Sequence, residues 1–363
     1  MLLAALFATA GVFAVDGPNA LLGLPAIVVP ADNPMTVEKI ALGRKLFMDR
    51  RLSPNNTLSC AMCHVPEQGF TQNELATSIG FEGKSLRRNA PTLLNVALHE
   101  SFQRDGAKAS LEEQVWGPLL AANEMANGTV EVVVSRVKNL ADYRGLFETA
   151  FASRTADQET IGQALASYER TLLAGDSRFD RWYFGRDTTA LSTEEIAGFD
   201  VFKRANCVTC HAIGKHAAPF TDNRFHNTGS HAATQQQASQ PISVQLAPGV
   251  SVMVDPVDLA NVSEPKQPDE GRFEVTGDPI DRHAYKTPSL RNVALTAPYM
   301  HDGSIATLAG VIDFYASGVG CTVAPRAELS PQNRRQLLAF LNSLTGANAA
   351  DLGRDARAGF ANY

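Results

Sequence analysis

The sequence lacks the features that would place it in several large classes of protein. Its 363 residues carry a formal net charge of −6, so there is no basic excess of the kind that binds nucleic acid. The apolar run at its start, residues 1–14, is too short to span a membrane. Cysteine is scarce, with five residues in the whole chain, and the positions of those five are therefore informative.

Four of the five cysteines lie in two Cys-x-x-Cys-His motifs. This motif is typical of covalent c-type haem attachment, in which two thiols add to the haem vinyl groups and the histidine becomes the proximal iron ligand. The alternative is two redox or zinc-binding cysteine pairs, but a redox pair needs no following histidine and zinc would need the pairs close together. We therefore predict two covalently bound haem c groups, and Cys321 has no assigned role. The predicted haem-binding residues are Cys60, Cys63 and His64 in the first motif and Cys207, Cys210 and His211 in the second.

The start of the chain is consistent with export. Residues 1–14 resemble the apolar core of a signal peptide, with Val12-Phe13-Ala14 as the candidate cleavage site. The basic segment that normally precedes such a core is missing, which leaves open a start further upstream. Haem is attached to Cys-x-x-Cys-His motifs on the outer side of the bacterial inner membrane. We therefore predict a periplasmic protein whose residues 1–20 form a signal or N-terminal segment.

The two motifs head two similar halves of the chain. When Asp105-Gly106 is aligned with Asp302-Gly303, residues 91–98 match residues 288–295. An internal repeat of this length indicates two related structural units. We predict an N-terminal haem domain over residues 21–185 and a C-terminal haem domain over residues 186–363, related by a pseudo-two-fold axis.

Helical spacing dominates the rest of the chain and predicts a mainly α fold with long loops. Apolar residues recur at helical spacing over residues 160–182, and residues 37–48 and 332–344 also have helical patterns. Ser110-Leu-Glu-Glu113 has the pattern of a helix-capping box, and Thr307 occupies the same place in the second half. Residues 232–269 are rich in Gln, Pro, Ser and Val, and we expect an irregular excursion there.

The repeat also compares the residues that face each iron. Thirteen residues beyond the aspartate of each Asp-Gly pair, the first half has Pro118 and the second half has Tyr315. Proline cannot bind iron and interrupts a helix, whereas tyrosine binds ferric haem as the phenolate. If this helix position faces the metal, the second haem is six-coordinate through His211 and Tyr315, and the first haem is open. From spacing alone, an aromatic residue packed in the core is the favoured interpretation of Tyr315.

Several motifs resemble those of the bacterial di-haem cytochrome c peroxidase and MauG family. They run from LGRKLFMDRRLS before Cys60 to LLAFLNSLTG near the C-terminus, and so cover nearly the whole chain. The resemblance implies that Tyr315 is the axial ligand of the second haem, a position that holds Met in typical peroxidases of the family and Tyr in MauG. Met300 is the rival ligand, since thioethers also bind haem iron. The most specific motifs are RNAPT at Arg88, LEEQ at Leu111, NEM at Asn123, FTDNRFHNTG at Phe220 and TPSLRNVALTAPYMHDGS at Thr287.

The resemblance also implies the residues of the first haem pocket. Gln114 and Glu124 match the distal Gln and Glu of the family. A carboxylate above an open iron has the chemistry to take a proton from one peroxide oxygen and return it to the other. The less favoured alternative is that Glu124 is a solvated loop residue. Many peroxidases of the family carry a histidine that blocks the first haem, whereas Phe81 follows Ser78-Ile79-Gly80 here. We therefore expect a first haem that is open without prior reduction.

Two further implications concern the region between the haems. Asn89, with the backbone carbonyls of Thr296 and Pro298, matches the Ca²⁺ site of the family, and oxygen ligands of this kind suit Ca²⁺. The tryptophan that the family usually places between its haems is missing, because Arg104 stands at that position. We expect Arg104 either to hold haem propionates through charge-assisted hydrogen bonds or to cap a loop.

The predicted function is that of a periplasmic di-haem peroxidase-family enzyme. In the manner of the MauG branch, it uses H2O2 to form high-valent haem and oxidise a protein or small-molecule substrate, because an anionic Tyr315 ligand favours high oxidation states. The first alternative is a cytochrome c peroxidase that reduces H2O2 to water with electrons from a small cytochrome c or cupredoxin. The second is a non-enzymatic electron carrier with two six-coordinate haems, and Phe81, Pro118 and the Gln114–Glu124 pair argue against it.

Overall fold

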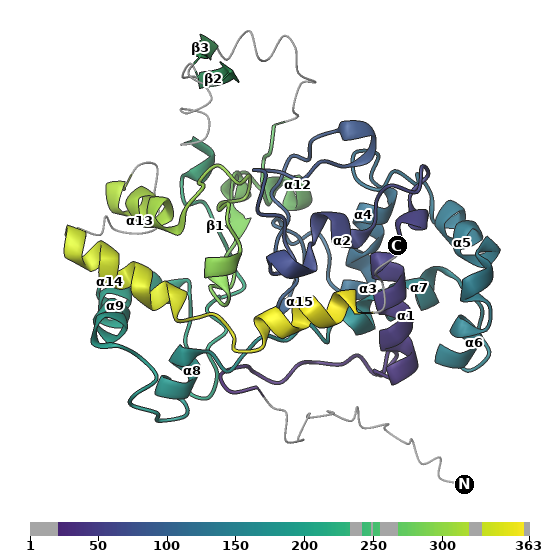
Figure 1. The fold of residues 1–363 in the computed structure, drawn as a ribbon, viewed down its shortest axis with the longest axis horizontal. Helices are drawn as coiled ribbons and strands as arrows, with labels where there is room; N and C mark the ends of the chain where they lie inside the picture. The colour runs from purple at the N-terminus through teal and green to yellow at the C-terminus, as the bar shows by residue number, and fades with distance from the viewer. Residues whose placement is uncertain (1–20, 233–241, 248–249, 255–267, 319–328, 359–363) are drawn as a thin grey trace.

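The computed structural model describes residues 21–232, 242–247, 250–254, 268–318 and 329–358. Over these residues the fold is mainly helical, as the sequence predicts, and Figure 1 shows the arrangement. The expected N-terminal segment, residues 1–20, and Cys321 lie outside the described residues. The α-helices are α1 (Val37–Met48), α2 (Cys60–Cys63), α3 (Leu111–Gln114), α4 (Trp116–Leu120), α5 (Val130–Asn139), α6 (Leu146–Ala150), α7 (Gln158–Glu169), α8 (Arg178–Tyr183), α9 (Thr193–Arg204), α12 (Phe273–Thr276), α13 (Leu308–Ser317), α14 (Pro331–Asn342) and α15 (Ala349–Arg357).

Short strands and 3₁₀ turns connect these helices. Strand β1 pairs antiparallel with β4, and β2 pairs antiparallel with β3. The strands are β1 (Phe225–His226), β2 (Ile242–Ala247), β3 (Val250–Val254) and β4 (Tyr285–Lys286). The 3₁₀ turns are η1 (Arg50–Leu52), η2 (Pro66–Gln68), η3 (Phe81–Gly83), η4 (Val96–Leu98), η5 (Ala141–Tyr143), η6 (Cys207–Thr209), η7 (Pro279–Asp281) and η8 (Val293–Leu295).

Two hydrophobic cores organise the chain, one for each half. In the first, Phe47 of α1 packs against Tyr168 of α7, with ring centroids 5.3 Å apart. In the second, Phe202 of α9 packs against Phe340 of α14 at 5.1 Å. Figure 1 shows α1, α5, α6 and α7 at one end of the molecule and α9, α13 and α14 at the other. The duplicated sequence therefore folds into two helical units.

Both cores contain a close helix crossing that depends on glycine. A Cβ atom on Gly43 of α1 would lie 1.9 Å from the carbonyl oxygen of Ala164 in α7. A Cβ atom on Gly198 of α9 would lie 1.9 Å from the carbonyl oxygen of Gln336 in α14. Only glycine lets the backbones approach so closely. The same device occurs in both halves, which supports the internal duplication.

The repeated Asn-Val-Ala-Leu segment also has the same structure in both halves. Asn95 and Asn292 have positive φ angles of 64° and 61° and precede the matching turns η4 and η8. The backbone N–H of Asn95 donates to Leu172 O at 2.7 Å, and that of Asn292 donates to Leu344 O at 3.1 Å. In each half, this segment is therefore hydrogen-bonded to the chain that directly follows a core helix, α7 in the first half and α14 in the second.

The expected domain boundary at residues 185 and 186 does not coincide with the division between the cores. Phe179 of α8 already belongs to the second core. The helix predicted over residues 160–182 is in fact two helices, since α7 ends at Glu169 and α8 begins after the cap at Ser177. Helix α15 crosses back to the first half, where Ala349 and Ala356 pack in the first core (Figure 1). The two units therefore interlock instead of following one another.

Two other predicted helices are present in the structure, whereas a segment predicted to be irregular contains paired strands. The helix predicted over residues 37–48 is confirmed as α1, and the one over 332–344 is α14, which begins at Pro331 and ends at Asn342. The expectation of an irregular excursion over residues 232–269 is wrong for its described part, which contains the β2–β3 hairpin. Two valine-containing stretches, β2 and β3, pair antiparallel there, because β-branched residues suit a strand pair.

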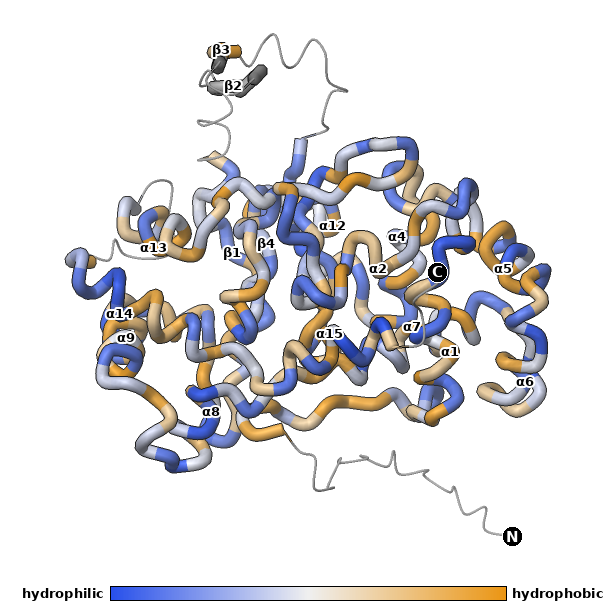
Figure 2. Tube along the Cα trace, viewed as in Figure 1, coloured by the Kyte–Doolittle hydropathy of each residue, from blue (hydrophilic) through white to orange (hydrophobic). Residues whose placement is uncertain are grey.

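Within the described ranges, no helix combines the length and apolar character needed to cross a bilayer. Figure 2 shows hydrophobic and hydrophilic residues interspersed along the helices, and α15 in particular carries many hydrophilic residues. This is the pattern of helices that bury one face against a core.

A buried ion pair stabilises the second core, and its loss should lower the free energy of unfolding. Arg291 donates to both carboxylate oxygens of Asp180 at 2.9 and 2.8 Å, and both side chains are at most 1% exposed. We expect Arg291→Met to lower the free energy of unfolding by about 3–5 kcal/mol, because it leaves a buried carboxylate unpaired. Chemical denaturation measures this. Arg181→Met, which breaks a surface pair with Asp176, is the control and should cost at most about 1 kcal/mol; equal losses would contradict the prediction.

Candidate active site

A single large cavity brings the two haem motifs together. Its volume is about 2130 Å³, roughly twice the upper end of the range of about 300–1,000 Å³ for a site that holds one small molecule. Both His64 and His211 line it, as do Cys63, Cys207 and Cys210. The structure therefore joins motifs that lie far apart in the sequence, in a space large enough for two cofactors.

The two histidines are oriented in the same way by backbone carbonyls. Nδ1 of His64 lies 3.2 Å from Phe70 O, and Nδ1 of His211 lies 2.9 Å from Phe220 O. Phe70 and Phe220 share a positive φ angle, 55° and 52° respectively. A metal-binding histidine typically donates its second ring N–H to such a carbonyl, which leaves Nε2 for the metal. Burial lowers the pKa of both imidazoles, so they are neutral at pH 7, the form that binds iron.

The cysteines beside these histidines are free of disulfide bonds. Cys60 and Cys63 lie on α2, and Cys207 and Cys210 lie on or next to η6. Burial raises the pKa of the Cys60 and Cys63 thiols, and it raises the pKa of the Cys207 thiol to about 11. Among the described residues, Cys210 lies close enough to Asp222 and His226 to share a metal ion with them. No other described cysteine belongs to such a group. The cysteines therefore fit two separate haem attachments and do not form a four-cysteine zinc site.

The helix of the first half that faces the cavity is interrupted at the predicted place. Ser110 caps α3 by accepting a hydrogen bond from the backbone N–H of Glu113. Pro118 has no N–H to donate to Gln114, so the helix divides into α3 and α4 between these two residues. Gln114 and Pro118 both line the cavity. Gln114 and Pro118 therefore occupy the positions that are equivalent to Val311 and Tyr315 in the second half.

Glu124 lies in the same cavity wall and is held there by the Ser78–Phe81 loop. The backbone N–H of Phe81 donates to Glu124 O at 2.9 Å. A Cβ atom on Gly80 would lie 1.9 Å from Asn123 O, so the loop packs tightly against the residues beside Glu124. Burial raises the pKa of the Glu124 carboxyl. The residues that line the cavity here are 82–88, and Phe81 is not one of them.

The second half lines the cavity with different residues. Thr307 caps α13 as predicted, by accepting from the backbone N–H of Gly310, and α13 places Val311 and Tyr315 against the cavity. The Tyr315 ring meets the Phe314 ring edge to face at 5.1 Å and is 37% exposed. Tyr315 is therefore not the core residue that spacing alone favours. Met300, the rival ligand, also lines the cavity, and the choice between them stays a prediction.

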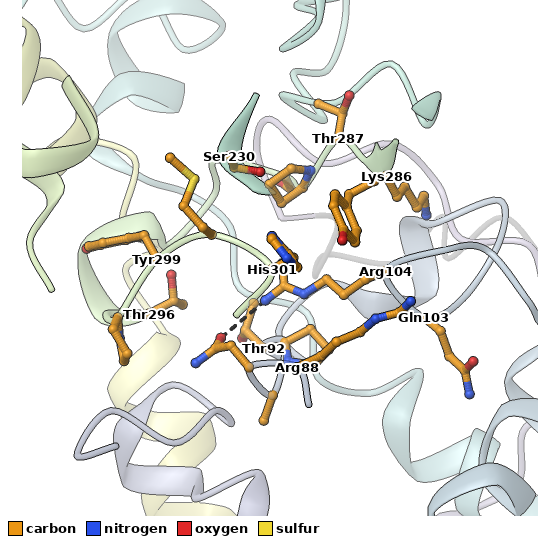
Figure 3. A pocket seen from close by; sticks show the side chains of 18 of the residues that line it. Arg88, Thr92, Gln103, Arg104, Ser230, Lys286, Thr287, Thr296, Tyr299 and His301 are labelled. Carbon is orange, nitrogen blue, oxygen red and sulfur yellow. Dashed lines mark hydrogen bonds between the residues drawn. The ribbon is translucent and has the colours of Figure 1, made fainter. Parts of the chain in front are cut away.

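The residues expected to bind calcium lie together but do not fit the ion. Asn89, Thr296 and Pro298 all line the cavity, and Arg104 donates to the Asn89 amide oxygen at 3.2 Å (Figure 3). Burial and the nearby charge of Arg88 lower the pKa of Arg104 to about 10, so its guanidinium is charged at pH 7. A Ca²⁺ bound to the same oxygen would lie about 5 Å from this cation, at a cost on the order of 7 kcal/mol for an effective dielectric constant of about 20.

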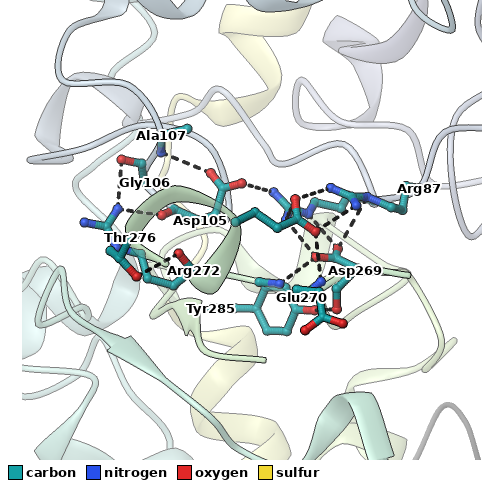
Figure 4. Close-up of polar contacts among 12 residues, drawn as sticks. Arg87, Asp105, Gly106, Ala107, Asp269, Glu270, Arg272, Thr276 and Tyr285 are labelled. Carbon is teal, nitrogen blue, oxygen red and sulfur yellow. Dashed lines mark hydrogen bonds and ion pairs between the residues drawn. The ribbon is translucent and has the colours of Figure 1, made fainter. Parts of the chain in front are cut away.

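A network of ion pairs joins the two halves beside the cavity, and sequence reasoning missed it. Arg88 pairs with Asp105 of the first half at 2.5 Å and with Asp269 of the second at 2.6 Å, and Arg87 pairs with Glu274 at 2.6 Å (Figure 4). Burial would raise the pKa of Asp269, but the hydrogen bonds and charge of Arg88 prevail and lower it to about 2. The RNAPT motif contains Arg88, but its acidic partners are distant in sequence.

A stack of aromatic rings was also unexpected. The His301 ring stacks on Tyr285 at 3.9 Å, and the His231 ring stacks on His283 at 3.8 Å. The rings of His231 and His301 lie 6.4 Å apart, so the two pairs adjoin. These residues come from three separate segments, and nothing in their spacing indicates that they meet.

Glu169, at the end of α7 near Cys60, predicts a pH dependence of stability. It is 4% exposed, its Oε2 has no hydrogen-bond partner, and burial raises its pKa to about 8. The folded state therefore keeps a proton that the unfolded chain releases near pH 4.5, so stability falls as pH rises from about 4.5 to 8. We expect Glu169→Gln to remove this loss, which is at most about 5 kcal/mol.

Denaturation of the haem-loaded protein at pH 5 and pH 9 measures this effect. Glu159→Gln on the same helix is the control, because the Glu159 side chain is 58% exposed and forms a surface ion pair with Arg154 at 2.8 Å. The same pH dependence in wild type and Glu169→Gln would show that Glu169 titrates normally.

The chain is similar in sequence and in structure to di-haem cytochrome c peroxidases and MauG proteins. A family model described as di-haem cytochrome c peroxidase matches residues 37–188. The methylamine utilization protein MauG of Methylorubrum extorquens is 36% identical over 333 residues, which cover 88% of this chain and 82% of that protein. Cytochrome c551 peroxidase of Nitrosomonas europaea is 32% identical over 347 residues, which cover 95% and 89%. The crystal structure of a MauG-like protein associated with microbial copper homeostasis is 33% identical, with a TM-score of 0.73 and coverage of 92% and 96%.

Proposed function

Because the chain belongs to the di-haem cytochrome c peroxidase family and is a di-haem peroxidase-family enzyme, we propose that it oxidises a substrate with H2O2 in the manner of MauG. Peroxide takes up two electrons and two protons and leaves as two water molecules. The substrate, a protein or a small molecule, loses the two electrons. The proposal distinguishes this chain from relatives that only remove peroxide at the expense of a cytochrome.

Two haem c groups, which membership of the family implies, supply the redox chemistry when bound. Cys60 and Cys63 would hold the first, with His64 as its proximal ligand. The second would be held by Cys207 and Cys210, with His211 as its ligand. The carbonyl oxygens of Phe70 and Phe220 fix both imidazoles in the orientation that this role requires.

Glu124 would move the proton that peroxide cleavage requires. Its carboxylate accepts the proton from one peroxide oxygen and returns it to the oxygen that leaves as water. A raised pKa suits this double role, since an acid whose pKa approaches the working pH both accepts and releases a proton readily. Gln114 would orient the peroxide by hydrogen bonding, and the Ser78–Phe81 loop keeps Glu124 in the cavity wall.

The observation that carries the proposal is the asymmetry between the two cavity-lining helices. At equivalent positions the first half has Pro118, which binds no metal, and the second has Tyr315. A phenolate ligand from Tyr315 would make the second site suited to storing an oxidising equivalent, and the first site would be open to peroxide. We further propose a periplasmic location, as c-type attachment requires export. A small cytochrome c or cupredoxin would replace the oxidised substrate as the source of electrons only in the cytochrome c peroxidase alternative. Calcium is not included, because Arg104 occupies its expected ligand Asn89.

Electron paramagnetic resonance (EPR) of the ferric, haem-loaded protein tests the proposal. We expect one high-spin and one low-spin signal, with loss of the high-spin signal after one equivalent of H2O2. Two low-spin signals that ignore peroxide would contradict an open first haem and favour an electron carrier or a peroxidase that needs reduction. Rapid oxidation of a reduced small cytochrome c at the expense of peroxide, with no other substrate, would favour the cytochrome c peroxidase alternative.

A further inference from the structure

Arg104 lies at the junction of the two halves. It follows Phe102, whose backbone pairs with Lys108 in a short bridge, and its own carbonyl accepts a hydrogen bond from Lys286 of β4 at 2.8 Å. Its side chain lines the cavity that both haem motifs share. Figure 3 shows Arg104 beside His301, and its guanidinium donates a hydrogen bond to the amide oxygen of Asn89. A residue of the first half thus places a positive charge where the two haem sites meet.

The Asn89 amide is fixed in the orientation that receives this charge. Its Nδ2 donates to Ala76 O at 3.0 Å, so the amide oxygen faces away from Ala76. Its backbone N–H donates to His301 O at 2.8 Å, which ties it to the second half. The remaining acceptor, Oδ1, takes a hydrogen bond from Arg104 Nη2 at 3.2 Å. The oxygen expected to bind calcium therefore already has a cationic partner.

The charges around Arg104 favour an anion and disfavour a second cation. Arg88 is close enough to lower the proton affinity of Arg104, and its own counter-ions Asp105 and Asp269 are already paired with it. Asp302 is the carboxylate that acts on Arg104, and its Oδ1 accepts from the backbone N–H of Ser304 at 3.0 Å. Ca²⁺ sites in proteins are built from carboxylate, carbonyl and water oxygens. A guanidinium hydrogen-bonded to one of these oxygens repels the ion.

One donor of Arg104 is still without an acceptor. Its Nε is buried and has no hydrogen-bond partner in the described chain. A buried N–H of this kind needs an acceptor, and a guanidinium prefers carboxylates. Haem propionates are carboxylates that the cofactors would bring into this cavity. The unpaired donor therefore matches the chemistry of the group that the cavity is built to hold.

We infer that Arg104 is a built-in cation that takes the place of calcium between the two haem sites, held by Asn89 on one side and by a haem propionate on the other. This inference rests on the proposed function only in requiring that both haems be attached. The holoenzyme is then calcium-independent, and the position between the haems is neither a metal site nor the site of an oxidisable side chain.

The test measures calcium directly in the holoprotein. The purified protein with both haems attached is equilibrated with CaCl2, passed through a desalting column and analysed for calcium and iron. A second sample is treated with EGTA, and its ferric EPR spectrum and melting temperature are recorded. We expect less than about 0.1 calcium per chain and no change in either property after EGTA. About one calcium per chain, or a spin-state change on chelation, would overturn the inference while leaving the peroxide reaction unaffected.

Variants at Arg104 test whether the side chain itself excludes the ion. We expect Arg104→Gln, which removes the charge, to gain a calcium-dependent rise in melting temperature of at least about 3 °C, because binding to the folded state alone stabilises it. Arg104→Lys keeps the charge and should stay unresponsive, as should the surface control Arg154→Gln, whose side chain is 44% exposed. An Arg104→Gln protein that matches wild type in stability, spectrum and calcium response would also overturn the inference. If that variant does not fold, the calcium content of wild type still decides.

Discussion

Glu124→Gln should slow the reaction with H2O2 by about 10²–10⁴-fold, the contribution usual for a positioned general acid–base group. The substitution keeps the size and the hydrogen-bonding capacity of the side chain but removes its ability to accept a proton. Stopped-flow mixing of ferric protein with peroxide gives the second-order rate constant from the change in the haem absorbance band. The haem content and the ferric EPR spectrum should stay the same, because Glu124 binds neither iron.

The pH profile separates this role from a structural one. Burial raises the pKa of Glu124, and the carboxylate is the form that accepts the first proton. The wild-type rate should therefore rise with pH through a value above the usual range for glutamate, and this limb should be missing in Glu124→Gln. Glu113→Gln is the matched control, since Glu113 is exposed and lies on α3 beside Gln114. A Glu124→Gln rate within about threefold of wild type would remove Glu124 from the mechanism.

Tyr315→Met should raise the midpoint potential of the second haem by roughly 0.2–0.4 V, part of the range of about 0.8 V that axial ligands span. A phenolate stabilises ferric and higher oxidation states, whereas a thioether stabilises ferrous iron. Spectroelectrochemical titration of the haem-loaded protein measures the potential of each haem. The variant should also lose substrate oxidation and become easier to reduce, which would make it behave more like a cytochrome c peroxidase.

Two further variants assign the ligand. Phe314→Met introduces the same thioether one residue away on α13, and it should leave both potentials unchanged within about 0.05 V. Met300→Leu removes the rival ligand, which lines the same cavity. If Met300→Leu alters the low-spin EPR signal and the potential while Tyr315→Met does not, then Met300 is the ligand and the MauG-like interpretation fails.

Much of the candidate site was predictable because its information is local or repeated. Each haem motif is contiguous, so covalent chemistry alone identifies Cys60, His64 and their counterparts. The repeat pairs Pro118 with Tyr315 without any structure. Ser110 and Thr307 were predicted as helix caps because a cap needs only a hydroxyl and the backbone that follows.

Other features were missed or placed wrongly because they depend on contacts between distant segments. The continuous helix expected over residues 160–182 breaks after Glu169, where the chain crosses from the first core to the second. The hydrogen bond from Arg104 to Asn89, the expected calcium ligand, was also missed, and this contact depends on the packing of two loops. Arg88 could be recognised as part of a motif, but its partners Asp105 and Asp269 are brought to it only by the fold.

The sequence by itself determined three features of this protein: two haem attachment motifs, a helical duplicated chain, and a proline and a tyrosine at the equivalent positions 118 and 315. These follow from covalent reactivity, hydrophobic periodicity and backbone rules, which act over short stretches of chain. Only the tertiary structure decided that both motifs share one cavity, that Glu124 lies in its wall and that Arg104 reaches the amide oxygen of Asn89. Burial and charge depend on which distant groups exclude water from a site, and no local pattern in the sequence records that.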